Sequence, residues 1–558
     1  MTIKFNEDKQ RQKIAGLREQ EEEGFAEAMA QKYKLPYVDL GVTPVNIDAL
    51  RIIKEGDARE AEVAAFNILN KRISVGIISP NNQKTITAIE NLKDRGYSPI
   101  LFMISHQSME KVWERYKDLS YALETKGGAL DIANEEIQEI IKTVKGAPDI
   151  KNLIETVIRE KKSYRISRIL EVMLAGAIAV NASDVHIEPE ENFVRLRYRL
   201  DGVLNDILEF DRDTFGLLLS RIKLISNLKL NLKGAQDGRF SIRLGDEEIE
   251  IRTSLLPGGY GESVVLRVLN PNAISVPLEE LGIEKKLLAL LLKELKKPNG
   301  MILNTGPTGS GKTTTLYAFL KKIHTPGIKI ITIENPVEYH LPGIVQTQTD
   351  EDKGYTFLEG LRSALRQDPD VIMVGEIRDE ETAEIAVNSA LTGHLVFSTL
   401  HTNNAAGTFP RLIDLGVNPK VITSAINIAM AQRLVRKLCP NCKKEAVPNT
   451  QEQKLIKETL ASIKDKSYIE GLQENKVYVG SGCEKCGFSG FKGRTGIYEA
   501  IISDEKIEAV VKENPSEREI AKAAENQGIL NMKEDGIIKV LRGITSLDEL
   551  GRVIDLSE

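Results

Sequence analysis

The feature that most constrains the fold of this chain is a glycine-rich loop that follows an apolar segment. Residues 300–323 read GMILNTGPTGSGKTTTLYAFLKKI and contain the full pattern G-x-x-x-x-G-K-[ST], from Gly306 to Thr313. Residues 301–304, the first three of which are apolar, predict a strand before the loop, and the residues after it predict a helix. A strand, this loop and a helix in that order form a phosphate-binding loop, or P-loop. The sequence therefore predicts an α/β domain that binds a nucleotide.

Each part of the loop has a chemical role. The glycines allow tight turns that direct backbone N–H groups at phosphate oxygens. We expect Lys312 to lie between the β- and γ-phosphates and the Thr313 hydroxyl to bind Mg²⁺. ATP is expected rather than GTP, because no N-K-x-D guanine-reading sequence follows the loop. The predicted nucleotide-binding residues are Gly306, Pro307, Thr308, Gly309, Ser310, Gly311, Lys312, Thr313 and Thr314.

Two later apolar segments end in glutamates. Residues 328–340 read IKIITIENPVEYH with Glu334 at the end of the apolar run, and residues 369–379 read PDVIMVGEIRD with Glu376 after a glycine. A carboxylate at the end of a parallel strand beside the phosphates can orient or deprotonate water. Such a carboxylate can also simply cap a turn or face solvent. Asp379 is predicted to cap the helix that follows.

Two histidines bracket the next predicted strand, HLVFSTLHT. They are His394 and His401. A neutral imidazole can hydrogen-bond to a γ-phosphate, although a lone histidine is more often a structural hydrogen-bonding group. Spacing alone leaves both interpretations open.

The four cysteines form two C-x-x-C pairs, Cys439 with Cys442 and Cys483 with Cys486. Two such turns can provide four thiolates for a tetrahedral Zn²⁺ site, which has no open position for catalysis. The alternative is two independent redox or free-thiol pairs. The long separation predicts an inserted helix and strand between the pairs.

With 558 residues, the chain is too long for one core. We predict an α/β multidomain protein: a small N-terminal α/β interaction domain with a linker at 124–152, an α+β domain with an Asp201-Gly202 hairpin turn, a RecA-like P-loop domain, a tetracysteine element and a helical C-terminal region. The predicted boundaries are 1–150, 151–275, 276–436, 437–500 and 501–558.

Composition excludes several classes of protein. The net charge of −6 argues against a general nucleic-acid-binding protein. No apolar run approaches the roughly 18 residues of a membrane-spanning helix, and residues 1–25 contain no secretory signal. The few, paired cysteines argue against a disulfide-linked secreted protein. We expect a cytoplasmic protein whose association with a membrane is peripheral and depends on partners.

The motifs together resemble a known family. GPTGSGKTTTL, TIENPVEY, VGEIRDEETA and TGHLVFSTLHTN are similar, in this order, to the Walker A, Asp box, Walker B and His box of the secretion ATPases of type II secretion and type IV pilus assembly. ASDVHIEP, RLRYRLDG and QDGRF resemble the domain before the motor, and CEKCGFSGFKGRTGIYE resembles part of the zinc element. The resemblance implies a homo-hexamer that hydrolyses ATP with Mg²⁺, contains Zn²⁺ and acts on a polytopic inner-membrane platform protein. Residues 1–150 would bind another assembly component.

The resemblance also implies roles for individual residues. Glu334 would position the attacking water, and Glu376 would hold Mg²⁺ through water or act as a base. His394 and His401 would contact the γ-phosphate. Arginines of the preceding domain would close the site, from the same or a neighbouring subunit; the candidates are Arg221 and Arg239.

The sequence departs from the family in one position. Asn335 replaces the usual aspartate of the Asp box and cannot act as a base. Residues 1–60 lack the repeat that binds cyclic di-GMP in some relatives, so this ligand is not predicted. The long N-terminal region and the cysteine pairs indicate an assembly motor and not a retraction motor. Two alternatives are a RecA-like nucleic-acid translocase, which the acidic charge disfavours, and a non-hydrolysing nucleotide sensor, which the complete catalytic boxes disfavour.

Overall fold

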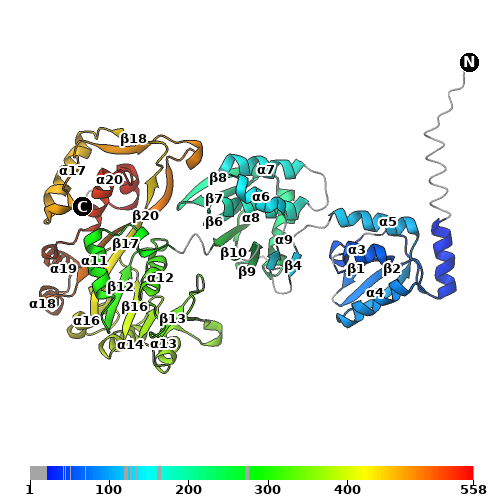
Figure 1. Cartoon of the computed structure of the whole chain (residues 1–558), viewed down its shortest axis with the longest axis horizontal. Helices are drawn as coiled ribbons and strands as arrows, with labels where there is room; N and C mark the ends of the chain where they lie inside the picture. Colours follow the sequence, from blue (N-terminus) through cyan, green and yellow to red (C-terminus); the bar gives the residue numbers. More distant parts are fainter. Residues whose placement is uncertain are drawn as a thin grey trace, which may run out of the picture. The chain divides into compact units, whose positions relative to one another are not determined.

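The computed structural model describes residues 22–556 with several short gaps, and the chain divides into two compact units (Figure 1). The first unit comprises mainly residues 22–125, and the second comprises mainly residues 172–556. Parts of the predicted linker, residues 126–128 and 132–134, lie outside the described residues. The other gaps are residues 42, 44, 51, 70, 119–122, 145, 160–164, 231, 233, 245–246 and 271–275.

The first unit is built on a three-stranded sheet in the order β1-β2-β3. β1 and β2 are antiparallel, whereas β2 and β3 are parallel and are connected through a helix. Residues 72–103 thus form a strand, a helix and a second strand. A helix over residues 22–33 precedes this sheet. The elements are α2 (Ile47–Leu50), α3 (Glu55–Glu60), β1 (Val63–Leu69), β2 (Arg72–Ile77), α4 (Gln83–Asp94), β3 (Ser98–Met103) and α5 (His106–Glu114).

Short strands and three helices follow in the chain. One of these helices, α6, lies within the predicted linker. These elements are β4 (Leu123–Thr125), β5 (Ala129–Asp131), α6 (Glu135–Thr143), α7 (Ala147–Arg159) and α8 (Arg165–Ala179).

The second unit begins with an antiparallel sheet that contains the order β9-β10-β11-β6-β7-β8. The predicted hairpin joins β7 and β8: Leu200 pairs with Val203, and Asp201 and Gly202 have φ values of 49° and 84°. Positive φ at both central residues is typical of a type I′ turn. The elements are β6 (Asp184–Pro189), β7 (Val194–Leu200), β8 (Val203–Phe210), α9 (Arg212–Ile225), β9 (Gln236–Leu244), β10 (Glu247–Gly258) and β11 (Gly261–Leu269).

A seven-stranded sheet in the order β14-β13-β15-β16-β12-β17-β20 forms the centre of the second unit. All neighbouring strands are parallel except β17 and β20. The strands β12, β13, β15 and β16 are buried throughout, as expected for a parallel sheet covered on both faces. The strands are β12 (Gly300–Thr305), β13 (Ile330–Glu334), β14 (Val345–Gln348), β15 (Val371–Val374), β16 (Leu395–Leu400), β17 (Ile426–Leu438) and β20 (Phe491–Ile502).

Helices cover both faces of this sheet (Figure 1). α11 and α12 pack on one face, against side chains such as Ile302 and Phe397. α13, α14 and α16 pack on the other, against side chains such as Leu303 and Val396. Asp379 caps α14 and accepts from the Thr382 N–H at 2.8 Å, as predicted. The helices are α11 (Lys285–Glu294), α12 (Lys312–Ile323), α13 (Phe357–Leu365), α14 (Glu380–Leu391), α15 (Thr408–Asp414) and α16 (Pro419–Ala425).

The last strand of the sheet comes from the region in which we predicted a separate cysteine element. β20 pairs with β17 and buries side chains on both of its faces, Ile497 on one and Tyr498 on the other. A strand that is apolar on both faces is stable inside a layered sheet and not in a surface turn. The remaining elements are α17 (Thr450–Ser462), α18 (Glu505–Glu513), α19 (Glu517–Ala524), α20 (Met532–Leu541), α21 (Leu547–Val553), β18 (Lys443–Ala446) and β19 (Val477–Gly480).

The helix and strand predicted between the cysteine pairs are confirmed as α17 and β19. Within the described residues, no helix combines the length and apolar character needed to cross a membrane.

Candidate active site

The glycine-rich loop connects the carboxyl end of β12 to the first turn of α12. Gly306, Gly309 and Gly311 all have positive φ, at 147°, 79° and 91°. A Cβ atom on Gly306 would lie 2.6 Å from the Gln432 carbonyl oxygen, and one on Gly311 would lie 2.7 Å from the Gln432 Nε2. Only glycine fits both this backbone and this close approach. The loop therefore has the shape that an N–H cradle for phosphate requires.

Lys312 points back over this loop. Its Nζ donates to the carbonyl oxygens of Gly306, at 2.7 Å, and Pro307, at 3.2 Å. Burial lowers the pKa of Lys312; Glu376 opposes this effect, and Arg433 adds to it. Thr313 is half-buried in the first turn of α12, where its hydroxyl is available to a Mg²⁺ bound to the phosphates. The loop, the lysine and the threonine fit Mg²⁺ with a nucleoside triphosphate.

Gln432 on β17 holds the elements beneath the loop. Its side chain is buried, and its Oε1 accepts from Asn304 Nδ2 at 2.9 Å and from Thr315 Oγ1 at 2.8 Å. One amide thus ties β17 to both β12 and α12. We did not predict this residue, although a glutamine within the apolar segment IAMAQRLV was a signal.

Arg433 adds a second cation beside the loop. Its Nη2 donates to the Asn403 carbonyl oxygen at 2.7 Å, and its Nη1 donates to the Gln432 carbonyl oxygen at 3.1 Å. A Cβ atom on Gly306 would lie 3.1 Å from this Nη1. Burial lowers the pKa of Arg433, and Glu499 opposes the shift. Arg433 was not among the predicted site residues.

Glu376 follows β15 at the carboxyl edge of the sheet. Its Oε1 lies 2.6 Å from Arg378 Nη2, and its Oε2 lies 3.3 Å from His401 Nε2. Its charge also acts on Lys312. The structure therefore brings together Glu376, His401 and Lys312, three of the predicted catalytic residues, and adds Arg378 to them.

Glu334 ends β13 and is buried, with a side chain that faces neither solvent nor a turn. It accepts from Thr332 Oγ1 at 2.5 Å, from Gln346 Nε2 at 3.2 Å and from the Tyr317 hydroxyl on α12. Burial raises the pKa of Glu334, and these three hydrogen bonds oppose the shift. The carboxylate is therefore fixed against the helix that begins at the P-loop.

The two predicted histidines lie at opposite ends of β16. His401 follows its carboxyl end and contacts Glu376. His394 precedes its amino end, where its carbonyl oxygen accepts from the Gly300 N–H and its Nδ1 lies 3.1 Å from the Ser389 carbonyl oxygen. Gly300 begins β12, whereas the P-loop follows its end. His394 therefore lies at the edge of the sheet opposite the P-loop and contacts the Ser389 carbonyl oxygen, and its contact with the γ-phosphate stays a prediction.

The two predicted arginines lie on other elements. Arg221 is half-buried on α9, and Arg239 is exposed on β9. Neither element carries the P-loop, Glu334 or Glu376. Their role in closing the site stays a prediction.

A cavity of about 420 Å³ adjoins the first turn of α12. Gly311 and Thr314 line it on the side of the P-loop, and Tyr498 and Gln432 also border it. Small-molecule sites have volumes of roughly 300–1,000 Å³. The cavity therefore has room for a nucleoside beside the phosphate loop.

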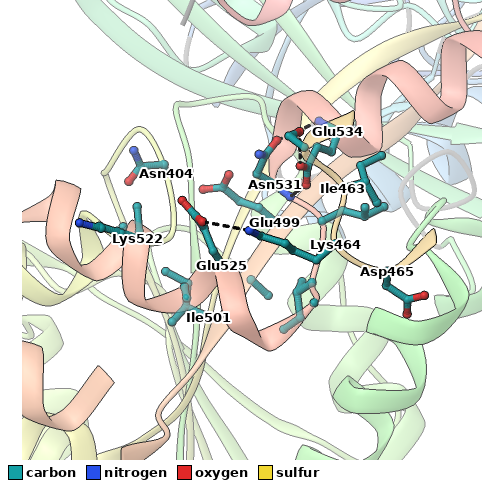
Figure 2. A pocket seen from close by; sticks show the side chains of 18 of the residues that line it. Asn404, Ile463, Lys464, Asp465, Glu499, Ile501, Lys522, Glu525, Asn531 and Glu534 are labelled. Carbon is teal, nitrogen blue, oxygen red and sulfur yellow. Dashed lines mark hydrogen bonds and ion pairs between the residues drawn. The ribbon is translucent and has the colours of Figure 1, made fainter. Parts of the chain in front are cut away.

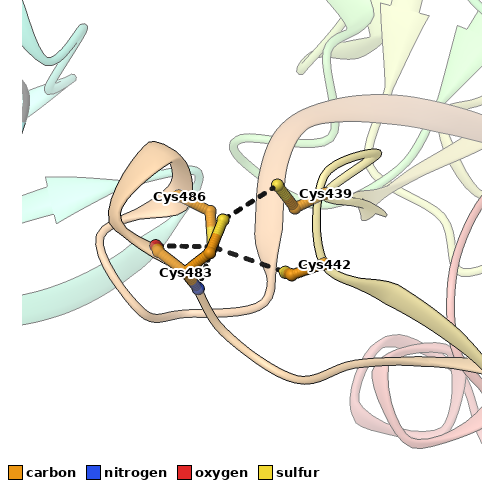
Figure 3. Close-up of side chains that lie close together, drawn as sticks. All are labelled: Cys439, Cys442, Cys483 and Cys486. Carbon is orange, nitrogen blue, oxygen red and sulfur yellow. Dashed lines mark hydrogen bonds between the residues drawn. The ribbon is translucent and has the colours of Figure 1, made fainter.

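The four cysteines converge at a separate place in the second unit (Figure 3). Their sulfur atoms lie within 4.8 Å of one another, and three of the separations are 3.8, 3.8 and 3.7 Å. Four sulfurs at about 2.3 Å from one zinc ion lie about 3.8 Å apart on a tetrahedron. The cluster could therefore hold a metal ion. All four cysteines are free, and none forms a disulfide.

A P-loop at the carboxyl edge of a parallel sheet, with a lysine and an acid facing it, defines a P-loop nucleotide-hydrolysing protein. Residues 159–552 match the family described as Type II/IV secretion system protein, and the chain belongs to this family.

Known relatives agree with this assignment. The chain is 42% identical to Type II secretion system protein E of Pseudomonas aeruginosa over 77% of this chain and 81% of the relative. It is 35% identical to Type IV pilus assembly ATPase PilB of Myxococcus xanthus over 95% of this chain and 91% of the relative. The protein is an ATPase of secretion or pilus assembly.

A solved structure shows the same fold. The X-ray structure of the Legionella pneumophila ATPase DotB matches 69% of this chain and 94% of that chain, with a TM-score of 0.50 and 22% sequence identity. This similarity supports the mixed α/β fold.

Proposed function

We propose that this protein hydrolyses ATP as a homo-hexamer at the cytoplasmic face of the inner membrane. The energy would power assembly of a type IV pilus or a type II secretion pseudopilus through a polytopic inner-membrane platform protein. The observation that carries the proposal is the convergence of Lys312, Glu376 and His401 at one edge of the nucleotide-binding sheet. The relatives in type II secretion and pilus assembly support the assembly role, and the P-loop sheet supports a RecA-like motor.

The P-loop would bind the phosphates through its backbone N–H groups, Lys312 and the Thr313 hydroxyl. Mg²⁺ bound with ATP would neutralise phosphate charge during the transfer of the γ-phosphoryl group to water. Arg433 and Lys312 provide fixed positive charge next to the loop, where a low-dielectric environment makes such charge effective. His401 would report the γ-phosphate, and its contact with Glu376 at 3.3 Å supports this role.

Glu334 and Glu376 would have different roles in hydrolysis. Glu376 follows the carboxyl end of β15 with 14% of its side chain exposed, so it can reach water or the metal ion's water shell. Glu334 is buried and accepts three side-chain hydrogen bonds, one of them from α12. We therefore assign Glu376 to the attacking water or to Mg²⁺, and Glu334 to the position of α12 and its loop.

The four cysteines would bind one structural Zn²⁺. All four tetrahedral positions are then occupied by Cys439, Cys442, Cys483 and Cys486, which leaves no position for a substrate. The first unit would bind another assembly component, because the P-loop and its partners lie in the second unit.

The decisive experiment is the substitution Glu376→Gln in the full chain. Phosphate release from Mg²⁺-ATP should fall by about 10³-fold or more, because the amide cannot accept a proton or hold the water shell of Mg²⁺. Binding of a non-hydrolysable ATP analogue should remain within about twofold, because the P-loop is unchanged. The matched control is Glu384→Gln, which removes an exposed carboxylate of α14. Turnover that is unchanged in Glu376→Gln would contradict the assigned role.

A further inference from the structure

A carboxylate outside the predicted site connects the catalytic loops to the C-terminal helices. Glu499 ends the segment GFSGFKGRTGIYE, which resembles the family's zinc element and has no role in the proposed function so far. It lies on β20 and lines a cavity of about 700 Å³ (Figure 2). Figure 2 shows it among Asn404, Asn531 and Glu525, whose side chains belong to three other segments.

Glu499 accepts two backbone hydrogen bonds from segments that are far apart in the sequence. Its Oε1 accepts from the Ala405 N–H at 2.7 Å, and its Oε2 accepts from the Met532 N–H at 3.1 Å. A carboxylate that accepts from backbone N–H groups forms stronger hydrogen bonds than a neutral acceptor. One side chain therefore joins the segment after β16 to the first turn of α20.

The segment held through Ala405 carries three contacts to the nucleotide site. His401 contacts Glu376. The Thr402 hydroxyl and N–H meet the Thr305 Oγ1, just before the P-loop, at 2.7 and 2.8 Å. The Asn403 carbonyl oxygen accepts from Arg433. Residues 401–407, the His401 loop, thus contact Glu376, Arg433 and Thr305, the residue just before the P-loop.

The other hydrogen bond of Glu499 anchors this contact in the protein core. Met532 begins α20, whose amino terminus is closed by a capping box between Asn531 and Glu534. On α20, Asp535 Oδ2 accepts from the Tyr498 N–H at 2.8 Å, next to Glu499 on β20. α20 and β20 therefore provide a rigid base for the carboxylate.

The electrostatic environment supports a specific role for this charge. Burial raises the pKa of Glu499, while the two N–H groups and Arg433 oppose the shift. Burying a carboxylate costs free energy because the charge loses its water. The charge of Glu499 interacts with Arg433, which lies beside the P-loop.

We propose that Glu499 is a positioning residue for ATP hydrolysis, which holds the His401 loop against the P-loop and couples this loop to α20. The proposal rests on the proposed function, because it assigns the P-loop as the site of hydrolysis. Glu499 touches none of the reacting atoms. It acts through Ala405 on His401 and Thr402.

The test is the substitution Glu499→Gln in the full chain. Glutamine has the same shape but only one acceptor oxygen, so one of the two N–H groups loses its partner. We expect kcat to fall about tenfold or more, because small displacements of catalytic groups can reduce rates by up to about 10²-fold. The affinity for a non-hydrolysable ATP analogue should stay within about twofold, because the P-loop glycines and Lys312 are unchanged. Amide hydrogen exchange of residues 403–407 should become faster.

The matched control is Glu534→Gln. Glu534 lines the same cavity and accepts from the Asn531 N–H at 3.0 Å and the Ser462 hydroxyl at 2.8 Å. It caps α20, and none of these contacts involves the His401 loop. We expect its loss to lower the Tm without a selective fall in kcat or faster exchange at residues 403–407.

Two results would overturn the inference. One is a kcat that is unchanged in Glu499→Gln; the other is an equal loss of kcat, Tm and exchange protection in both variants, which would show a purely structural role. Should Glu499→Gln not fold, Glu499→Asp keeps the charge but is one methylene too short to span both N–H groups, and an unchanged kcat in it overturns the inference as well. A failure of the proposed function is distinguishable, because Glu376→Gln would then retain full turnover.

Discussion

At the scale of single residues, the P-loop glycines differ in what surrounds them. Gly309 and Gly311 both have φ in the left-handed region, at 79° and 91°. A Cβ atom on Gly309 would meet no atom within 4 Å, whereas one on Gly311 would lie 2.7 Å from Gln432 Nε2. Gly309 is thus required by backbone conformation alone, and Gly311 also by packing.

This difference predicts which of two alanine variants loses more stability and more ATP affinity. Both pay a backbone cost of roughly 1–2 kcal/mol for a left-handed alanine. Gly311→Ala should also displace Gln432 and weaken its hydrogen bonds to Asn304 and Thr315, so it should lower the Tm and the ATP affinity more than Gly309→Ala does. Thermal unfolding and titration with a fluorescent ATP analogue would measure both effects. Equal losses in the two variants would show that Gln432 does not matter for the loop.

At the scale of elements, the cysteine cluster connects the turn after β17 to the turn before β20, beyond the last paired residues of the two strands. Cys439 follows β17, and Cys483 and Cys486 lie just before β20, so the cluster joins the ends of two paired strands. Backbone N–H groups of Cys483 and Gly490 donate to the Cys486 sulfur, each at 3.3 Å. Such donors favour a thiolate, the form that binds a metal.

Metal removal tests the proposed zinc ion. The purified chain should contain one Zn²⁺ per protein by elemental analysis, and Cys486→Ser should lose most of it. A chelator should lower the Tm of the wild-type chain and leave that of Cys486→Ser nearly unchanged, because metal binding stabilises the folded state. The control is Ser489→Ala, because Ser489 lies in the same turn but is not one of the four proposed zinc ligands. Full retention of zinc by Cys486→Ser would contradict a four-cysteine site.

At the scale of the whole molecule, the proposed hexamer would complete each site with groups from a neighbour. Arg239 is exposed on β9, away from the elements that carry the P-loop, and an exposed arginine can enter the site of another subunit. An arginine supplied in this way stabilises the negative charge of the transition state.

Mixing two inactive variants tests this arrangement. Arg239→Ala should lower kcat on the order of 10³-fold, the effect of removing an arginine finger. Hexamers mixed from Arg239→Ala and Glu376→Gln should recover activity, because some sites then combine an intact Glu376 with an intact Arg239 from the neighbour. Arg267→Ala, an exposed arginine of β11, should remain active by itself. If the ATPase activity of the mixture only equals the sum of the activities of the two separate variants, Arg239 does not act in the site of a neighbouring subunit.

Much of this protein could be predicted from short stretches of sequence. The P-loop follows from the eight positions of its pattern, because glycine conformation and phosphate chemistry are local requirements. The Asp201-Gly202 hairpin and the Asp379 cap were predicted for the same reason. The cysteine cluster was predicted from ligand chemistry, although its two pairs are separated by α17 and β19. The position of β20 at the edge of the seven-stranded sheet was not predicted. A strand that is buried on both faces is recognised only when both packing layers are known.

The sequence by itself thus determined the P-loop and the two cysteine pairs, since both depend on the identity and spacing of neighbouring residues. Only the tertiary structure decided which groups face the loop. It placed His401 at the site and His394 at the far end of the same strand, because the ends of a parallel strand lie at opposite edges of the sheet. It also brought Gln432 and Arg433 beneath or beside the P-loop, and Glu499 against the His401 loop, from strands more than 100 residues from the P-loop in the sequence. Contacts over such distances depend on sheet order, which no local pattern encodes.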